Sequence, residues 1–218
     1  MVRVTPETIK LRGGSLSVDF ANTVDWTEDD AEITATDALL EDDSLDRWGV
    51  RMEVFGRPGG PDEHELARGL RTALHLIFSA LARSEAPDAV SLARLRLAYA
   101  QAVTAGTLES RADGSFGLEW RDDEPRRVRF AVAADAVALL ADPTRLARLH
   151  RCPSRDCGWV FLDMSGRRRW CSMSTCGSRE KMRRMYGRRR AAQQIRAKRL
   201  SGAREGVRQS GRRTRVTP

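Results

Sequence analysis

Apolar residues recur at every third or fourth position in several long segments of the chain, which is the spacing of one buried helix face. The clearest stripe lies in residues 61–84, where Leu66, Leu70, Leu74 and Ile77 follow one another at this interval. A proline and three acidic residues at the start of the segment suit the first turns of a helix. The same reasoning predicts further helices over residues 45–55, 88–105, 127–141 and 143–149.

Two places show patterns that are typical of strands. In residues 12–22, apolar and polar side chains alternate from Leu16 to Phe20 after a pair of glycines, which predicts a turn and a short half-buried strand. Residues 107–109 and 116–120 flank an Asp-Gly pair and predict a β-hairpin. The N-terminal part of the chain is therefore expected to be mainly helical with a few short strands.

Charge divides the chain in a way that the total conceals. The sequence carries 38 Lys and Arg against 30 Asp and Glu, a net charge of +8. Residues 1–150 hold 18 basic and 26 acidic residues, whereas residues 151–218 hold 20 basic and 4 acidic ones. Net charges of −8 and +16 indicate a module for binding polyanions that follows an acidic domain.

The composition excludes two broad classes of protein. A hydrophobic content of 41% is too high for wholesale disorder, and no apolar run approaches the roughly 18 residues of a membrane-spanning helix. The N-terminus lacks the apolar region of a secretory signal, so we expect a soluble, cytoplasmic protein.

The four cysteines form two close pairs. Four residues separate Cys152 from Cys157, thirteen lie between the pairs, and four separate Cys171 from Cys176. Two such pairs, joined by a hairpin, can supply the four thiolates of a tetrahedral zinc site. We expect residues 159–163 and 168–170 to be the strands of that hairpin, with a helix beginning at Cys176 in a treble-clef-like arrangement.

Other uses of these cysteines are less favoured by the pattern. Two disulfides would be unusual in a cytosolic chain, four unrelated thiols would not cluster within 25 residues, and an iron–sulfur cluster remains possible on ligand type. Four thiolates leave no open position on the metal, so the zinc would be structural. In such a small unit it should supply most of the folding free energy.

Residues 152–181 resemble the CGNR-type zinc finger. One position departs from the family pattern: Ser178 stands where the family has Asn, and a serine there can still cap a helix or donate a hydrogen bond. The matching positions are the two cysteine pairs together with Phe161, Asp163, Ser165, Arg169, Trp170, Ser172, Met173, Gly177, Arg179 and Lys181.

The front of the chain is similar to the ABATE domain that accompanies this finger. The similarity rests on residues 13–23, with Trp48 as a later landmark. The resemblance implies a stress-related transcription regulator in which the finger binds DNA and the upstream domain senses a ligand. The domains expected are 1–148 (ABATE-like), 149–200 (finger and basic helix) and 201–218 (a disordered basic tail).

The basic residues after the finger are too many for one narrow helix face, so the helix should be positive over most of its surface. Arginines can pair with phosphates or guanine edges. The same basic pattern would also arise if these charges only balanced those of the acidic domain in the same chain. The candidate nucleic-acid residues are Arg167, Arg168, Arg169, Arg179, Lys181, Arg183, Arg184, Arg188, Arg189 and Arg190.

Asp19 and Asn22 are candidates for lining an effector pocket, or they could close the turn beside them by hydrogen bonds to the backbone. No catalytic set of side chains emerges, so we predict a zinc-dependent DNA-binding regulator that is not an enzyme. Two alternatives are kept: an RNA- or ribosome-associated protein, and a ligand-binding or enzymatic N-terminal domain whose finger is purely structural. The sequence does not indicate an oligomeric state.

Overall fold

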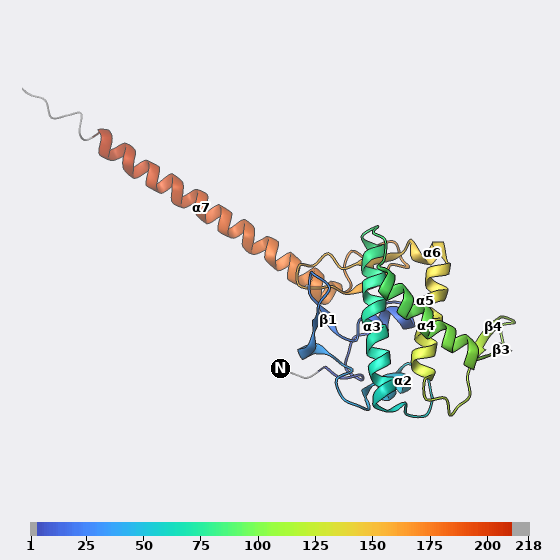
Figure 1. Ribbon diagram of the computed structural model, residues 1–218. Coiled ribbons are helices and arrows are strands. Elements are labelled where there is room, and N and C mark those ends of the chain that lie inside the picture. Colours follow the sequence, from blue (N-terminus) through green and yellow to red (C-terminus); the bar gives the residue numbers. More distant parts are fainter. Residues whose placement is uncertain (1–3, 211–218) are drawn as a thin grey trace, which may run out of the picture. The chain divides into compact units, whose positions relative to one another are not determined.

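The computed structural model describes residues 4–210 (Figure 1), and the side chains up to residue 195. The chain divides after Met173 into two compact units. The first unit is built around three long helices that pack against one another: α3 (Gly60–Ala82), α4 (Ala89–Ala105) and α5 (Arg127–Ala141). The shorter elements of the first unit are α1 (Leu16–Ala21), β1 (Asp25–Trp26), β2 (Glu32–Ile33), η1 (Thr34–Thr36), α2 (Ser44–Arg51), β3 (Thr107–Ser110), β4 (Phe116–Glu119), α6 (Pro143–Leu146), β5 (Leu149–Arg151) and β6 (Val160–Leu162).

The long helices form where the apolar spacing predicts them. α3 and α5 bury one continuous face each, and α4 begins after Asp88, whose side chain accepts a hydrogen bond from the Ser91 amide. The core between them includes Leu70, Leu74, Ile77 and Phe78 of α3. The fold is therefore α+β and mainly helical, because the three sheets found in residues 4–210 are antiparallel pairs of short strands.

The prediction of a strand from Leu16 to Phe20 is wrong, since this segment belongs to helix α1. The Ser15 hydroxyl caps the helix by accepting from the Val18 amide, and Gly14 (φ = 90°) supplies the left-handed turn before it. Residues 17–21 are all buried, so the alternation of polar and apolar residues does not mark an outer and an inner face. Polar partners inside the protein satisfy Ser17 and Asp19.

The hairpin of the finger also differs from the prediction. β6 pairs antiparallel with β5, which precedes the first cysteine, and residues 168–170 are not a strand. The loop that holds Cys152 and Cys157 is therefore the connection of the hairpin. Leu149, Val160 and Leu162 belong to the main hydrophobic core, so this hairpin is part of the N-terminal body.

Two further elements follow β6 in the described part of the chain. A short π-helical segment, η2 (Met173–Gly177), leads into α7 (Ser178–Ser210). α7 extends ten residues into the segment 201–218 that was predicted to be a disordered tail, and residues 211–218 lie outside the described residues. Among the described residues, no helix is both long and apolar enough to cross a membrane.

Candidate metal centre and basic surface

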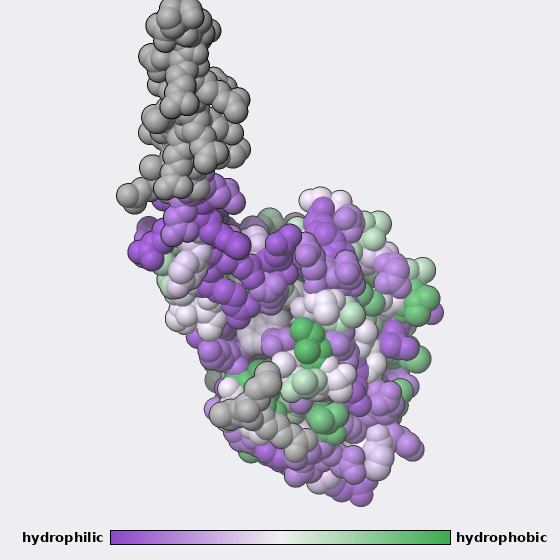
Figure 2. All heavy atoms as spheres, turned by 90° about the vertical axis from the view of Figure 1, so that its left-hand side faces the viewer, coloured by the Kyte–Doolittle hydropathy of each residue, from purple (hydrophilic) through white to green (hydrophobic). Residues whose placement is uncertain are grey.

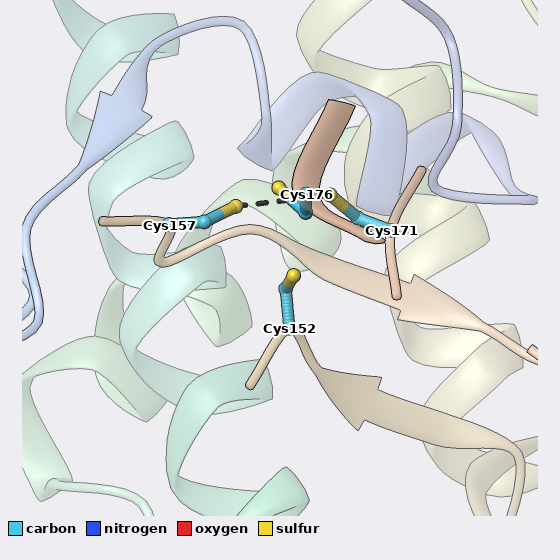
Figure 3. A group of neighbouring side chains, drawn as sticks. All are labelled: Cys152, Cys157, Cys171 and Cys176. Atoms are coloured by element: carbon cyan, nitrogen blue, oxygen red, sulfur yellow. Dashed lines mark hydrogen bonds between the residues drawn. The ribbon is translucent and has the colours of Figure 1, made fainter. Parts of the chain in front are cut away.

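The four cysteines meet at one point, and their sulfur atoms point toward one another (Figure 3). Cys152 follows β5, Cys157 precedes β6, and Cys171 and Cys176 lie on either side of the start of η2. All four Sγ atoms are within 4.8 Å of one another, and three of the four residues are buried. The cysteine pairs predicted from the sequence are thus brought together.

The donor set fits a zinc ion. Four sulfur atoms at about 2.3 Å from a tetrahedral zinc are about 3.8 Å apart, and Cys157 Sγ lies 3.7 Å from Cys171 Sγ. Hydrogen bonds from the neighbouring thiols lower the pKa of Cys152, and the same contacts raise the pKa of Cys157. The cluster therefore resists holding several thiolates together unless a cation compensates their charge.

The first cysteine loop is held by backbone contacts. The Cys152 amide donates to Trp159 O (2.8 Å), and the Cys157 amide donates to Ser154 O (3.0 Å). Gly158 lies so close to the N-terminal body that a Cβ there would be 2.6 Å from the Cβ of Trp26. Only glycine fits this position, which fixes the second ligand of the loop against the body.

Asn22 joins α1 to the strand that follows this loop. Its amide nitrogen donates to Val160 O (2.8 Å), and its Oδ1 accepts from Val160 N (3.2 Å). Asp19 Oδ1 accepts a hydrogen bond from the Gly13 amide at 2.7 Å. Burial raises the pKa of Asp19, although hydrogen bonds from the backbone amides of residues 12–14 act to lower it. Both side chains therefore have structural partners, and a ligand-binding role for them stays a prediction.

We expect Asn22→Ala to lower the free energy of unfolding by about 2 kcal/mol, because the change leaves a buried N–H and a buried C=O of Val160 without their partner. Urea unfolding followed by circular dichroism measures the change. Gln193→Ala, on the exposed surface of α7, is the control and should not alter the midpoint. Equal stability of both variants would mean that Asn22 does not secure β6.

The other strand of the hairpin, β5, is held by an ion pair and hydrogen bonds from its last residue. Arg151, directly before Cys152, donates from Nη2 to Asp30 Oδ1 (3.1 Å) and to the backbone oxygens of Thr27 and Glu28. Asp30 also accepts from the buried His75, whose ring stacks on Trp26 with centroids 3.7 Å apart. The sequence carries no local signal for this network, because Asp30 lies 45 residues from His75 and 121 residues from Arg151 in the chain.

Arg168 has a structural role that the sequence prediction missed. Its guanidinium donates to Leu162 O (3.1 Å), Arg12 O (2.9 Å) and Cys171 O (2.8 Å), and it lies 4.6 Å from the centre of the Phe161 ring. Asp163 Oδ2 accepts from the Arg168 amide and shapes the turn before it. These contacts use the donors of Arg168 within the fold.

The other predicted basic residues lie at the surface of their own segments. Arg167 and Arg169 are exposed, and so are six of the seven basic residues of α7 up to residue 195, whereas Arg183 is half-buried and pairs with Glu180 at 3.3 Å. Hydrophilic residues cover most of the face drawn in Figure 2, with small separate hydrophobic patches between them. The exposed candidates of α7 are Arg179, Lys181, Arg184, Arg188, Arg189 and Arg190.

Comparison with known protein families finds two matches that together span most of the chain. Residues 14–143 match the ABATE family, described as "Putative stress-induced transcription regulator". Residues 148–189 match the CGNR zinc finger. No curated protein matches the sequence. The four cysteines and the first turns of α7 all lie within the second match.

Proposed function

Because the chain belongs to the ABATE family of putative stress-induced transcription regulators, we propose that it is a cytoplasmic, zinc-dependent regulator that binds DNA. The observation that carries this proposal is the position of the basic helix. α7 begins two residues after the fourth cysteine, and residues 178–195 contain seven basic side chains and a single acidic one. A zinc-fixed loop that leads into such a helix is a suitable platform for a polyanion.

Zinc and the basic helix have different roles in the proposed DNA binding. Zinc supplies a fixed arrangement of the four cysteine segments. The arginines of α7 pair with phosphates, since a guanidinium presents two parallel N–H donors to two oxygens. Contacts of this kind give affinity and register, whereas base sequence is read only by side chains that reach a groove edge.

The N-terminal body is proposed to sense a small ligand. A ligand that binds the body changes DNA affinity only to the extent that it favours one state of the finger over another. The shared core of β5, β6 and the helices supports such coupling, because the cysteine loop cannot shift without disturbing Asn22 and Arg151.

The first test is the salt dependence of DNA binding. If about six phosphates are neutralised, the logarithm of the association constant should fall with the logarithm of salt concentration with a slope near −5. Replacing Arg188, Arg189 and Arg190 with Gln should reduce the slope by about 2.7 units, since each lost phosphate contact contributes about 0.9. Fluorescence anisotropy with a labelled duplex measures both slopes.

A matched triple variant controls for net charge. Replacing Arg57, Arg94 and Arg96 with Gln removes the same charge from exposed positions of the N-terminal body and should leave the slope nearly unchanged. A clear preference for structured RNA at equal salt would replace DNA by RNA in the proposal. No binding to either nucleic acid would leave the finger with a structural role only and refute the proposal.

A further inference from the structure

An open groove of about 600 Å³ lies on the first unit, between the segment that precedes α1 and the segment that leads to the third cysteine. Its volume is in the range of sites that take small molecules or one nucleotide. No local sequence pattern indicates this groove, because Arg12 and Arg168 are 156 residues apart. The groove is lined by Leu11, Arg12, Arg167, Arg168, Arg169, Trp170, Cys171, Ser172 and Met173.

The charge of the groove is of one sign. Four arginines line it, and of the described residues no carboxylate does. Arg168 is occupied by backbone carbonyls, whereas the salt bridges found among the described residues include none to Arg12, Arg167 or Arg169. The Nε of Arg12 is buried without a hydrogen-bond partner. The buried Nε is out of a ligand's direct reach, so an anionic ligand in the groove would pair with the other guanidinium nitrogens that line it.

One wall of the groove is apolar and aromatic. Trp170 is half-exposed, and the guanidinium of Arg169 lies 5.9 Å from the centre of its ring. Leu11 and Met173 add exposed apolar surface, with 38% and 65% of each residue accessible. A planar ring can stack on an indole and contact such side chains, whereas a bare phosphate cannot use them.

The two sides of the groove are fixed to each other. Arg168 donates to the carbonyl of Arg12 on one side and to the carbonyl of Cys171 on the other. Cys171 is also one of the four cysteines of the metal centre. A site that is held in shape before its ligand arrives loses less free energy to ordering when it binds.

We propose that this groove binds a nucleoside phosphate, with the base against Trp170 and the phosphate between Arg12 and Arg169. The nucleotide has two possible sources, a free nucleotide or one residue of a nucleic-acid strand. The second source rests on the proposed DNA binding, and the first does not. In both cases the N-terminal body contributes Arg12, a residue outside the zinc finger, to the recognition of the ligand.

The experiment uses the full zinc-loaded chain and three probes: ADP, inorganic pyrophosphate and an eight-residue oligothymidylate. Isothermal titration calorimetry gives each affinity. We expect the double variant R12Q/R169Q to weaken every probe that binds by about tenfold or more, and W170L to weaken ADP or the oligonucleotide by about tenfold but not pyrophosphate. R57Q/R96Q, which removes two exposed arginines outside the groove, should bind as the unchanged protein does.

The outcomes separate the two sources and the two proposals. ADP binding that depends on Arg12 and Trp170 identifies a free nucleotide, and the same dependence for the oligonucleotide alone identifies a strand. The α7 variant R188Q/R189Q/R190Q should retain ADP binding, so a failure of DNA binding leaves this test intact. Zinc content and melting temperature verify that each variant is folded.

A second measurement does not depend on the variants. If a variant does not fold, the indole N–H resonance of Trp170 in the unchanged protein must shift on addition of a probe. The proposed nucleotide site would be overturned if no probe binds, or if these substitutions leave the affinities unchanged.

Discussion

Removing zinc from the intact chain should lower the melting temperature of the whole N-terminal body, by about 10 °C or more, and Cys171→Ala should do the same. Zinc bound by four thiolates contributes about 10–16 kcal/mol of apparent binding free energy to small zinc-dependent folds. The melting temperature of a domain of this size moves by about 2–4 °C for each kcal/mol. Even a fraction of the zinc contribution therefore gives a large shift.

The physical reason is that the finger and the body share one core. Leu149, Val160 and Leu162 pack with the residues of α3 and α5, and Leu162 N donates to Gly13 O at 2.7 Å. The sequence predicts a finger with little core of its own, for which zinc supplies most of the folding free energy. With a shared core, loss of the metal frees the loop of Cys152 and Cys157 and weakens the packing on both sides of β6.

Differential scanning calorimetry of the full chain, with and without a strong chelator, measures the effect. One transition that moves to lower temperature and recovers when zinc is returned is the expected result. Arg155→Ala, an exposed change between the first two cysteines, is the control and should melt with the unchanged protein. If the chelator does not change the melting temperature of the N-terminal body, the shared core is stable without metal and the prediction is wrong.

The features that the sequence predicted well are those whose information is local. The stripe through Leu70, Leu74 and Ile77 defines α3 because a helix satisfies its hydrogen bonds within a few residues. The metal centre was predictable for a similar reason, since each cysteine pair spans one short loop and only one long-range closure joins them.

The errors concern features that depend on distant partners. Residues 16–21 alternate like a strand, but Ser17 is polar and buried because Asp135 of α5 accepts from its hydroxyl at 2.6 Å. The strand at Val160 could pair with residues on either side of it, and the cysteine loop selects the preceding side. The groove at Arg12 and the Arg151 network depend wholly on such contacts, so no local pattern could reveal them.

Arg71→Met should lower the free energy of unfolding by about 3–5 kcal/mol at pH 7, because it removes the main partner of a buried carboxylate. The side chains of Arg71 and Asp37 are both fully buried. The two guanidinium nitrogens reach the two Asp37 oxygens at 2.5 and 3.0 Å, and Nη2 also donates to Glu32 at 2.9 Å. This fork holds residues 32–37 against α3.

The pH dependence of the variant follows from Asp37. Burial acts to raise the pKa of Asp37, but the hydrogen bond and charge of Arg71 outweigh it and hold this pKa below its ordinary value. The stability from the pair is therefore complete above about pH 4 and is lost as the pH falls further. Without Arg71, Arg68 Nη2 (3.2 Å) and the Leu39 amide (2.8 Å) still contact Asp37, but burial is the largest effect on its pKa. The pKa of Asp37 should therefore rise, and protonation should relieve the variant. The stability difference between the two proteins should thus narrow from pH 7 to pH 4.

Urea unfolding at the two pH values measures this difference, and Arg47→Met is the matched control. Arg47 also faces three acidic residues, Glu7, Glu41 and Asp43, but its side chain is 34% exposed and water replaces the partners it loses. Its substitution should have a far smaller effect with little change between pH 7 and pH 4. A loss for Arg71→Met that is equal at both pH values would mean that the arginine acts by packing alone and that Asp37 carries no unpaired charge in the variant.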